Sequence, residues 1–130
     1  MARVLIVEDQ LAARVLLKSV LSRAGYQTIL AENGAEALEQ LRLDPSIDIV
    51  VTDIDMPKMD GIELLSRLAA ATRPVAAIVV TVYSVRERAS WADALHGVDV
   101  VEKPFDAYSF LQTLDRVLAA ESLAASSSTQ

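Results

Sequence analysis

Four short apolar runs, each followed by a polar or charged residue, limit what this chain can fold into more than any other feature of its sequence. The runs and the residues after them are Val4–Val7 with Glu8 and Asp9, 47–52 with Asp53, 77–80 with Thr81, and Val100-Val101 with Lys103. Apolar runs of this length are typical of strands buried in a sheet. In α/β proteins the carboxyl ends of such strands are where ligands bind. The pattern therefore predicts one site built from the ends of four strands.

Helical patterns separate these runs, and one more short strand is expected over residues 26–31. Gly25 ends the first helix, and Asn33-Gly34 begins a second with Ala35, Leu38 and Leu41 on its inner face. Alternating strands and helices imply a parallel sheet with helices on both faces and right-handed crossovers. The periodicity leaves the strand order open.

The last helix is expected to begin after Asp106, which suits an N-cap, and to finish its packing near residue 120. Residues 121–130 are rich in Ala and Ser and carry no further apolar stripe. We therefore predict one domain over residues 1–120 and a linker or frayed tail over 121–130.

The composition narrows the class of protein. A hydrophobic content of 52% suits a sheet covered on both faces, and no apolar stretch approaches the length of a membrane span. The chain has no cysteine, which excludes disulfides and thiolate metal sites and is compatible with the cytoplasm, the location we expect. A net charge of −6 argues against direct nucleic-acid binding by this domain.

Glu8, Asp9 and Asp53 would bring three carboxylates together if the first and third strands are neighbours. Like charges at that distance repel one another unless a cation lies between them, and oxygen ligands favour Mg²⁺. Thr81 can donate a hydrogen bond, and Lys103 supplies a positive charge suited to phosphate. A carboxylate in these surroundings can act as the nucleophile in phosphoryl transfer.

The same residues resemble the receiver domain of two-component response regulators over about residues 2–119. The motifs that carry the resemblance are Val7-Glu8-Asp9, the stretch from Thr52 to Gly61 with its Asp-x-x-Met-Pro-x-Met-Asp-Gly pattern, Thr81, and Lys103-Pro104-Phe105. The resemblance implies a flavodoxin-like doubly wound sheet of five parallel strands in the order 2-1-3-4-5. It also implies a cis peptide bond before Pro104.

By this resemblance Asp53 accepts a phosphoryl group from the phosphohistidine of a partner kinase. Asp9 and Asp53 bind Mg²⁺ directly, Glu8 acts largely through water, and the backbone carbonyl of Asp55 completes the protein ligands. Thr81 contacts the phosphoryl oxygens together with the lysine that follows the fifth strand.

Three further positions bear on how the phosphoryl signal is kept and transmitted. Asp55 and Tyr83 are expected to flank the path of water and so to tune the phosphoryl lifetime. Receivers usually carry Tyr or Phe three residues before the lysine, a ring that swings inward with the threonine, but here that position is Val100. The resemblance therefore implies a switch that works without the usual aromatic residue.

The resemblance also implies the partners. We expect a sensor histidine kinase or phosphotransfer protein as the phosphodonor, and a homodimer or output partner on the face of the fourth helix, fifth strand and fifth helix, near Trp91. The chain is expected to catalyse only its own phosphorylation and dephosphorylation, and to be no other enzyme. No contact with nucleic acid or membrane is expected.

Two alternatives stay open at the level of sequence. Asp53 and Asp55 also fit the Asp-x-Asp motif of haloacid-dehalogenase-type phosphatases, although Glu8 and Asp9 would then have no role. A degenerate receiver that acts only as a docking module is the second alternative. The complete set of acids, hydroxyl and lysine argues against it, while Val100 argues for it.

Overall fold

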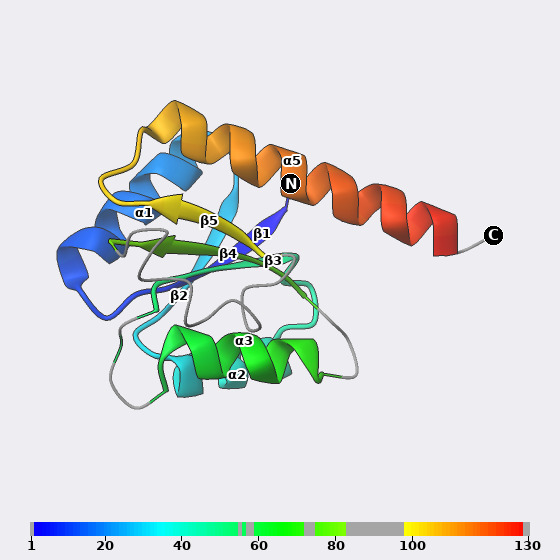
Figure 1. Cartoon of the computed structure of the whole chain (residues 1–130), viewed down its shortest axis with the longest axis horizontal. Helices are drawn as coiled ribbons and strands as arrows, with labels where there is room; N and C mark the ends of the chain where they lie inside the picture. The colour runs from blue at the N-terminus through cyan, green and yellow to red at the C-terminus, as the bar shows by residue number, and fades with distance from the viewer. Residues whose placement is uncertain (1, 55, 57–58, 72–74, 83–97, 129–130) are drawn as a thin grey trace.

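The computed structural model describes residues 2–54, 56, 59–71, 75–82 and 98–128. Its five strands form one parallel sheet in the order β2-β1-β3-β4-β5, which confirms the expected flavodoxin-like topology (Figure 1). The strands are β1 (Arg3–Val7), β2 (Gln27–Ala31), β3 (Ile49–Thr52), β4 (Ala76–Thr81) and β5 (Asp99–Glu102). The described helices are α1 (Leu11–Arg23), α2 (Gly34–Leu43), α3 (Gly61–Ala69) and α5 (Ala107–Ser128).

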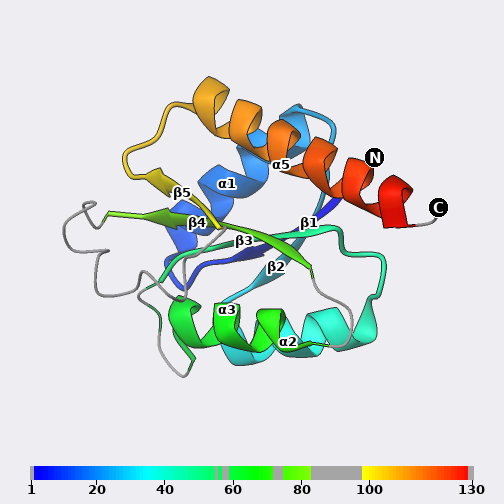
Figure 2. The same ribbon diagram turned by 45° about the vertical axis from the view of Figure 1, so that its right-hand side comes forward.

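Alternate residues of each strand enter two separate cores, as expected for a sheet buried on both faces. One core packs Leu5, Val7, Val50 and Val79 against α2 and α3. The other packs the intervening strand residues against α1 and α5, with Phe110 and Leu114 completely buried. The turned view shows the sheet between these two helical layers (Figure 2).

The register of the sheet brings the ends of the strands together. Val7 of β1 pairs with Thr52 of β3, and Thr81 of β4 pairs with Glu102 of β5. Because all strands are parallel, the residues that follow them emerge at one edge. This arrangement positions the polar residues that the sequence placed after each apolar run.

Local sequence sets where the helices begin and end. Gly25 adopts φ 95°, the left-handed conformation that stops α1 without steric cost. The side chains of Asn33 and Asp60 accept hydrogen bonds from the backbone N–H groups of Glu36 (2.8 Å) and Glu63 (2.9 Å), which caps α2 and α3. Asp106 likewise accepts from the N–H of Ser109 (3.0 Å), as predicted for the last helix.

Two details differ from the sequence prediction. Leu38 and Leu41 of α2 pack against the core as predicted, but Ala35 is exposed, and Gly34 and Ala37 are the buried residues of the helix. A Cβ at Gly34 would lie 2.8 Å from the carbonyl oxygen of Met59, so the absence of a side chain lets the helix pack closely there. The expected tail is helical as far as Ser128, because Ala, Leu and Glu favour helix and extending a helix needs no new nucleation.

The fourth helix expected from the sequence, with Trp91 and Tyr83, falls on residues 83–97 and lies outside the described residues. Among the residues described, no helix has both the length and the apolar character required to cross a bilayer. The extent of the domain over residues 1–120 remains a prediction.

A polar contact joins the residue before β2 to α5 on one face of the sheet. The hydroxyl of Tyr26, just before β2, donates a hydrogen bond to a carboxylate oxygen of Asp115 on α5. Burial, the hydrogen bond and the negative charge of Asp115 together raise the pKa of Tyr26 to about 12. The contact therefore helps to hold α5 against the sheet.

We predict that Tyr26→Phe lowers the free energy of unfolding by about 1 kcal/mol at neutral pH, because one hydrogen bond to a charged group is lost. The folded-state pKa of Tyr26 lies above its ordinary value of 10.0, so the stabilisation is complete below pH 10 and is lost as the pH rises towards about 12. Denaturant unfolding and tyrosinate absorbance measure the two effects. Tyr108→Phe, which removes the hydroxyl of an exposed tyrosine, is the control and should keep the late-titrating signal.

Candidate functional site

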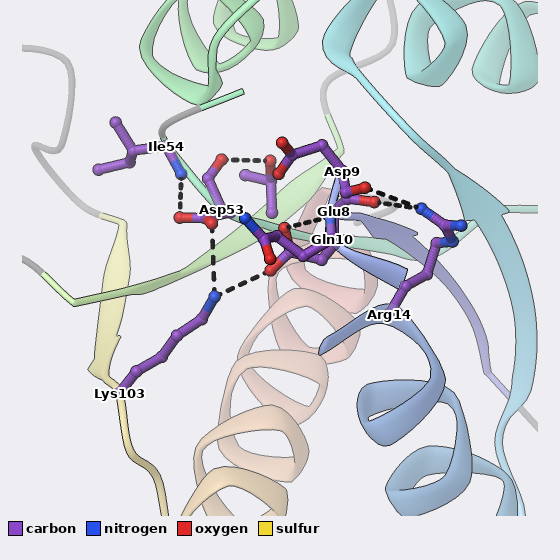
Figure 3. A network of polar contacts seen from close by, with 8 residues as sticks. Glu8, Asp9, Gln10, Arg14, Asp53, Ile54 and Lys103 are labelled. Carbon is purple, nitrogen blue, oxygen red and sulfur yellow. Dashed lines mark hydrogen bonds and ion pairs between the residues drawn. The ribbon is translucent and has the colours of Figure 1, made fainter. Parts of the chain in front are cut away.

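Three carboxylates meet at the carboxyl edge of the sheet, as the sequence predicted. Glu8 and Asp9 follow β1, Asp53 follows β3, and one oxygen from each lies within 4.8 Å of the others (Figure 3). The cluster lies beside a cavity of about 370 Å³ lined by Asp9, Gln10, Ala12, Ala13, Asp53, Val82 and Lys103. The cavity is large enough for a phosphoryl group and a hydrated cation.

Asp53 is held firmly but keeps access to solvent. Its N–H donates to the carbonyl of Val7 (3.1 Å), which extends the pairing between β1 and β3 by one residue. Its carboxylate Oδ1 accepts from the N–H of Ile54 (2.7 Å), and its side chain is 15% exposed. These contacts fix the direction of a carboxylate that an incoming group can still reach.

Lys103 lies between two of the acids. Its Nζ is 2.8 Å from Glu8 Oε1 and 3.4 Å from Asp53 Oδ2. Burial by itself lowers the pKa of the ammonium group, but the hydrogen bond to Glu8 and the charges of both acids outweigh it and raise the pKa above its ordinary value. Lys103 therefore stays charged and compensates part of the negative charge.

Glu8 is almost completely buried, and both of its carboxylate oxygens have partners. Oε1 bonds Lys103, and Oε2 accepts from the N–H of Gln10 (3.2 Å). These contacts occupy both oxygens of Glu8, and its expected action on a metal through water stays a prediction.

Asp9 is the acid whose hydrogen-bonding capacity is not filled within the described residues. Its Oδ1 is buried and has no hydrogen-bond partner within the described part of the chain. Burial raises the pKa of this carboxyl, and the adjacent Glu8 raises it further. A buried carboxylate oxygen without a donor is costly unless a cation approaches it. This orphaned atom, in a set of oxygen donors only, fits Mg²⁺.

The fourth and fifth strands supply the rest of the predicted set. Thr81 is completely buried at the end of β4, and its carbonyl accepts from the N–H of Lys103 (2.7 Å). The bond between Lys103 and Pro104 is cis, as the resemblance implied. Val100 is half-buried on β5 opposite Val79 and packs against the core under α2 and α3. The backbone carbonyl of Asp55 and the ring of Tyr83 lie outside the described residues.

Gly61 approaches the backbone of the predicted acceptor more closely than any side chain would allow. Its N–H donates to the carbonyl of Ile54 (2.8 Å), and a Cβ built on it would lie 2.2 Å from the carbonyl oxygen of Asp53. The start of α3 is thereby packed directly beneath the site. In the sequence Gly61 was noted only as part of a motif. A close approach between two backbone segments leaves no sequence pattern other than the glycine itself.

Sequence reasoning missed two residues that shape the site. Gln10 donates its N–H to Glu8, and the guanidinium of Arg14 reaches the carbonyls of Glu8 and Asp9 (Figure 3). These contacts use backbone N–H and carbonyl groups, which do not depend on residue type, so the sequence does not reveal them. A cation in the first turn of a helix, where the helix dipole disfavours it, was the available signal for Arg14.

The chain is similar to known receivers along most of its length. The sequence profile of the response regulator receiver domain matches residues 4–115. Sporulation initiation phosphotransferase F of Bacillus subtilis is 36% identical over 104 residues, which are 80% of this chain and 83% of the relative. The response regulator receiver protein CpdR of Brucella abortus is 32% identical, with 92% and 99% covered. The transcriptional regulatory protein ZraR of Escherichia coli is 34% identical over 89% of this chain, which spans only 26% of ZraR.

Solved structures agree with this likeness. A receiver domain protein from Clostridium thermocellum superposes with a TM-score of 0.85 at 25% identity, covering 95% of this chain and 99% of that one. The response regulator TrrA from Thermotoga maritima, solved with Mg²⁺-BeF, superposes with a TM-score of 0.79 at 30% identity and covers 90% and 99%. The likeness therefore extends to relatives whose structure contains the metal.

We predict that Gly61→Ala lowers the free energy of unfolding by about 1–3 kcal/mol, because the added Cβ must displace backbone atoms at Asp53 and Ile54. Chemical denaturation measures the loss. Ser66→Ala, a change of similar size on the exposed face of the same helix, is the control. Equal stability of the two variants would contradict the close packing.

Proposed function

The chain belongs to the receiver domain family of two-component response regulators, and from that premise we propose how its residues carry out phosphoryl transfer. Asp53 is the phosphoacceptor. The observation that carries the proposal is the convergence of three carboxylates and Lys103 at one cavity, with Asp53 fixed by backbone hydrogen bonds yet reachable from it. Two-component signalling by this family is the setting in which the transfer takes place.

The reaction exchanges one bond to phosphorus for another. A carboxylate oxygen of Asp53 forms the new P–O bond, the P–N bond to the donor's histidine breaks, and the freed imidazole nitrogen keeps the electron pair and takes up a proton. Asp9 and Asp53 would hold Mg²⁺, which supplies positive charge that neutralises the carboxylates and the phosphoryl oxygens. Glu8 acts on the ion through water, and the carbonyl of Asp55 is proposed as a further ligand.

Lys103 changes partners in this proposal. Without a phosphoryl group its shorter contact is to Glu8 (2.8 Å) and its longer one to Asp53 (3.4 Å). A phosphoryl group on Asp53 places new anionic oxygens near the ammonium group, and the buried hydroxyl of Thr81 lies at the end of the neighbouring strand. Lys103 and Thr81 therefore bind the phosphoryl oxygens and respond to their arrival.

The response is transmitted without an aromatic ring at Val100. The hydrogen bond from the N–H of Lys103 to the carbonyl of Thr81 couples the ends of β4 and β5 directly through the backbone. Movement of Thr81 is passed along these strands towards the expected dimer or output face of the fourth helix, β5 and α5. Tuning of the phosphoryl lifetime by Asp55 and Tyr83 belongs to the same proposal.

The surface beside the acceptor suits the docking of a phosphodonor protein. Leu11, Val15 and Leu16 of α1 are more than half exposed, as is Val82. An apolar hollow of about 320 Å³ lies between α1 and the start of the β5–α5 connection, and it shares Ala13, Val82 and Lys103 with the acceptor cavity. A donor that delivers its phosphohistidine to Asp53 must cover this surface, and burial of the exposed apolar side chains would favour that contact.

The alternatives receive less support. Membership of the receiver family gives Glu8 and Asp9 a role that the phosphatase interpretation lacks. The retained acids and lysine favour a working acceptor over a docking module. We propose that the chain catalyses only its own phosphorylation and dephosphorylation, and its cytoplasmic location remains a prediction.

With Mg²⁺ and a small acyl-phosphate donor, we expect the protein to gain one phosphoryl group and Asp53→Asn to gain none. Intact-mass analysis measures the addition, and chelation of the metal should prevent it. Asp106→Asn is the control, because this aspartate caps α5 and is not part of the acidic cluster. Labelling of Asp53→Asn at the wild-type level would refute the assignment.

We also predict that Leu16→Ser slows phosphorylation by a histidine kinase on the order of tenfold, since an exposed apolar contact is lost. Labelling by the acyl phosphate should stay at the wild-type rate. Any kinase that phosphorylates the wild-type protein in vitro serves for the measurement. Leu43→Ser, a similarly exposed leucine at the end of α2, is the control. Equal rates for the two variants would place the donor surface elsewhere.

A further inference from the structure

Arg14 is a cation in an unfavourable place. It is the fourth residue of α1, whose N-terminal end carries a partial positive charge from the helix dipole. Its side chain is nevertheless only 12% exposed. A charged side chain that is withdrawn from water at the wrong end of a helix must have compensating partners.

The partners of Arg14 are the peptide groups that carry the two acids after β1. Its Nη1 donates to the carbonyl of Glu8 (2.8 Å) and lies 3.5 Å from the carbonyl of Asp9. Its Nη2 lies 3.5 Å from a carboxylate oxygen of Glu32, which is itself 63% exposed. Figure 3 shows the side chain turned from α1 towards the connection between β1 and α1.

This connection has few other anchors. The N-cap residue Gln10 makes no side-chain capping bond, and the first turn of α1 holds no acidic residue. The N–H of Glu8 bonds the carbonyl of Ala31 and the N–H of Gln10 bonds the Glu8 carboxylate, but neither contact holds the carbonyl groups of Glu8 and Asp9. Within the described residues, Arg14 is therefore the side chain that holds the carbonyl groups of the acidic pair.

We propose that Arg14 is a positioning residue for the Mg²⁺ site. By holding the peptides of Glu8 and Asp9, it keeps Asp9 Oδ1 directed at the same ion as Asp53. Outer contacts of this kind orient metal ligands, and their loss commonly weakens binding by tenfold or more. The inference rests on the proposed function, since it requires that the acidic cluster binds Mg²⁺.

The geometry separates this role from a simple effect of charge. An arginine near three carboxylates repels an incoming cation, so removal of its charge alone would make Mg²⁺ bind more tightly. Loss of the hydrogen bonds to the carbonyls would make Mg²⁺ bind more weakly. The two explanations predict opposite directions for the same variant.

The experiment measures the Mg²⁺ dissociation constant of the whole chain by isothermal titration calorimetry. We expect Arg14→Gln to bind on the order of tenfold more weakly than the wild type. Arg14→Lys, which keeps the charge and one donor group, should recover part of the affinity. Arg67→Gln removes the same charge from the exposed face of α3 and should bind like the wild type. Glu32→Gln should also bind nearly like the wild type, because the carbonyl groups and not Glu32 are the partners that matter.

Each outcome decides between the explanations. Unchanged or tighter binding by Arg14→Gln would overturn the inference and leave the Mg²⁺ site intact, whereas no binding by the wild type would refute the proposed site itself. Thermal unfolding in the presence of a chelator shows whether each variant is folded. If Arg14→Gln does not fold, Arg14→Lys decides, since wild-type affinity in that variant would contradict the proposed positioning.

Discussion

Three carboxylates within 4.8 Å of one another repel, and the rest of the site is arranged around that repulsion. The repulsion arises from the parallel sheet, because pairing of β1 with β3 brings Asp9 and Asp53 to the same edge. Lys103 compensates part of the negative charge through a 2.8 Å contact with buried Glu8. Among the described residues no donor reaches the buried Asp9 Oδ1, which would therefore suit a divalent cation. The proposed affinity for Mg²⁺ would thus follow directly from how the strands pair.

The same electrostatic arrangement would let the proposed site respond to a phosphoryl group. Lys103 is shared between an acid that is buried and an acid that is reachable from the cavity. New anionic oxygens at Asp53 would compete with Glu8 for one ammonium group, and the backbone hydrogen bond from Lys103 to Thr81 would couple that competition to the ends of β4 and β5. A ligand can shift an equilibrium only through contacts that differ between two states, and in the proposed function Lys103 would provide such a difference.

The sequence was most informative where a side chain followed a strand directly. Asp53, Thr81 and Lys103 were found because an apolar run has a definite end and the parallel topology fixes where that end lies. Features that depend on the backbone were harder to predict. The burial of Gly34 in place of the expected Ala35 reflects a close backbone approach to Met59, and neither this approach nor the carbonyl partners of Arg14 can be read from the hydrophobic pattern. Residues 121–128 were expected to be a linker or frayed tail because the apolar stripe of the last helix stops before them. The helix nevertheless continues, since helix-favouring residues follow the stripe.

The edge strand β5 has a consequence for behaviour at high concentration. A chain that is 52% hydrophobic is at risk of associating through an exposed strand edge. β5 is only four residues long, and it begins with Asp99 and ends with Glu102. Arg116 of α5 pairs with Asp99 (2.8 Å), which adds a second charge beside the first residue of the strand. A second molecule that paired with this edge would have to desolvate these charges. Because β5 is so short, it would gain very few hydrogen bonds in return, and the shortness of the strand therefore opposes aggregation.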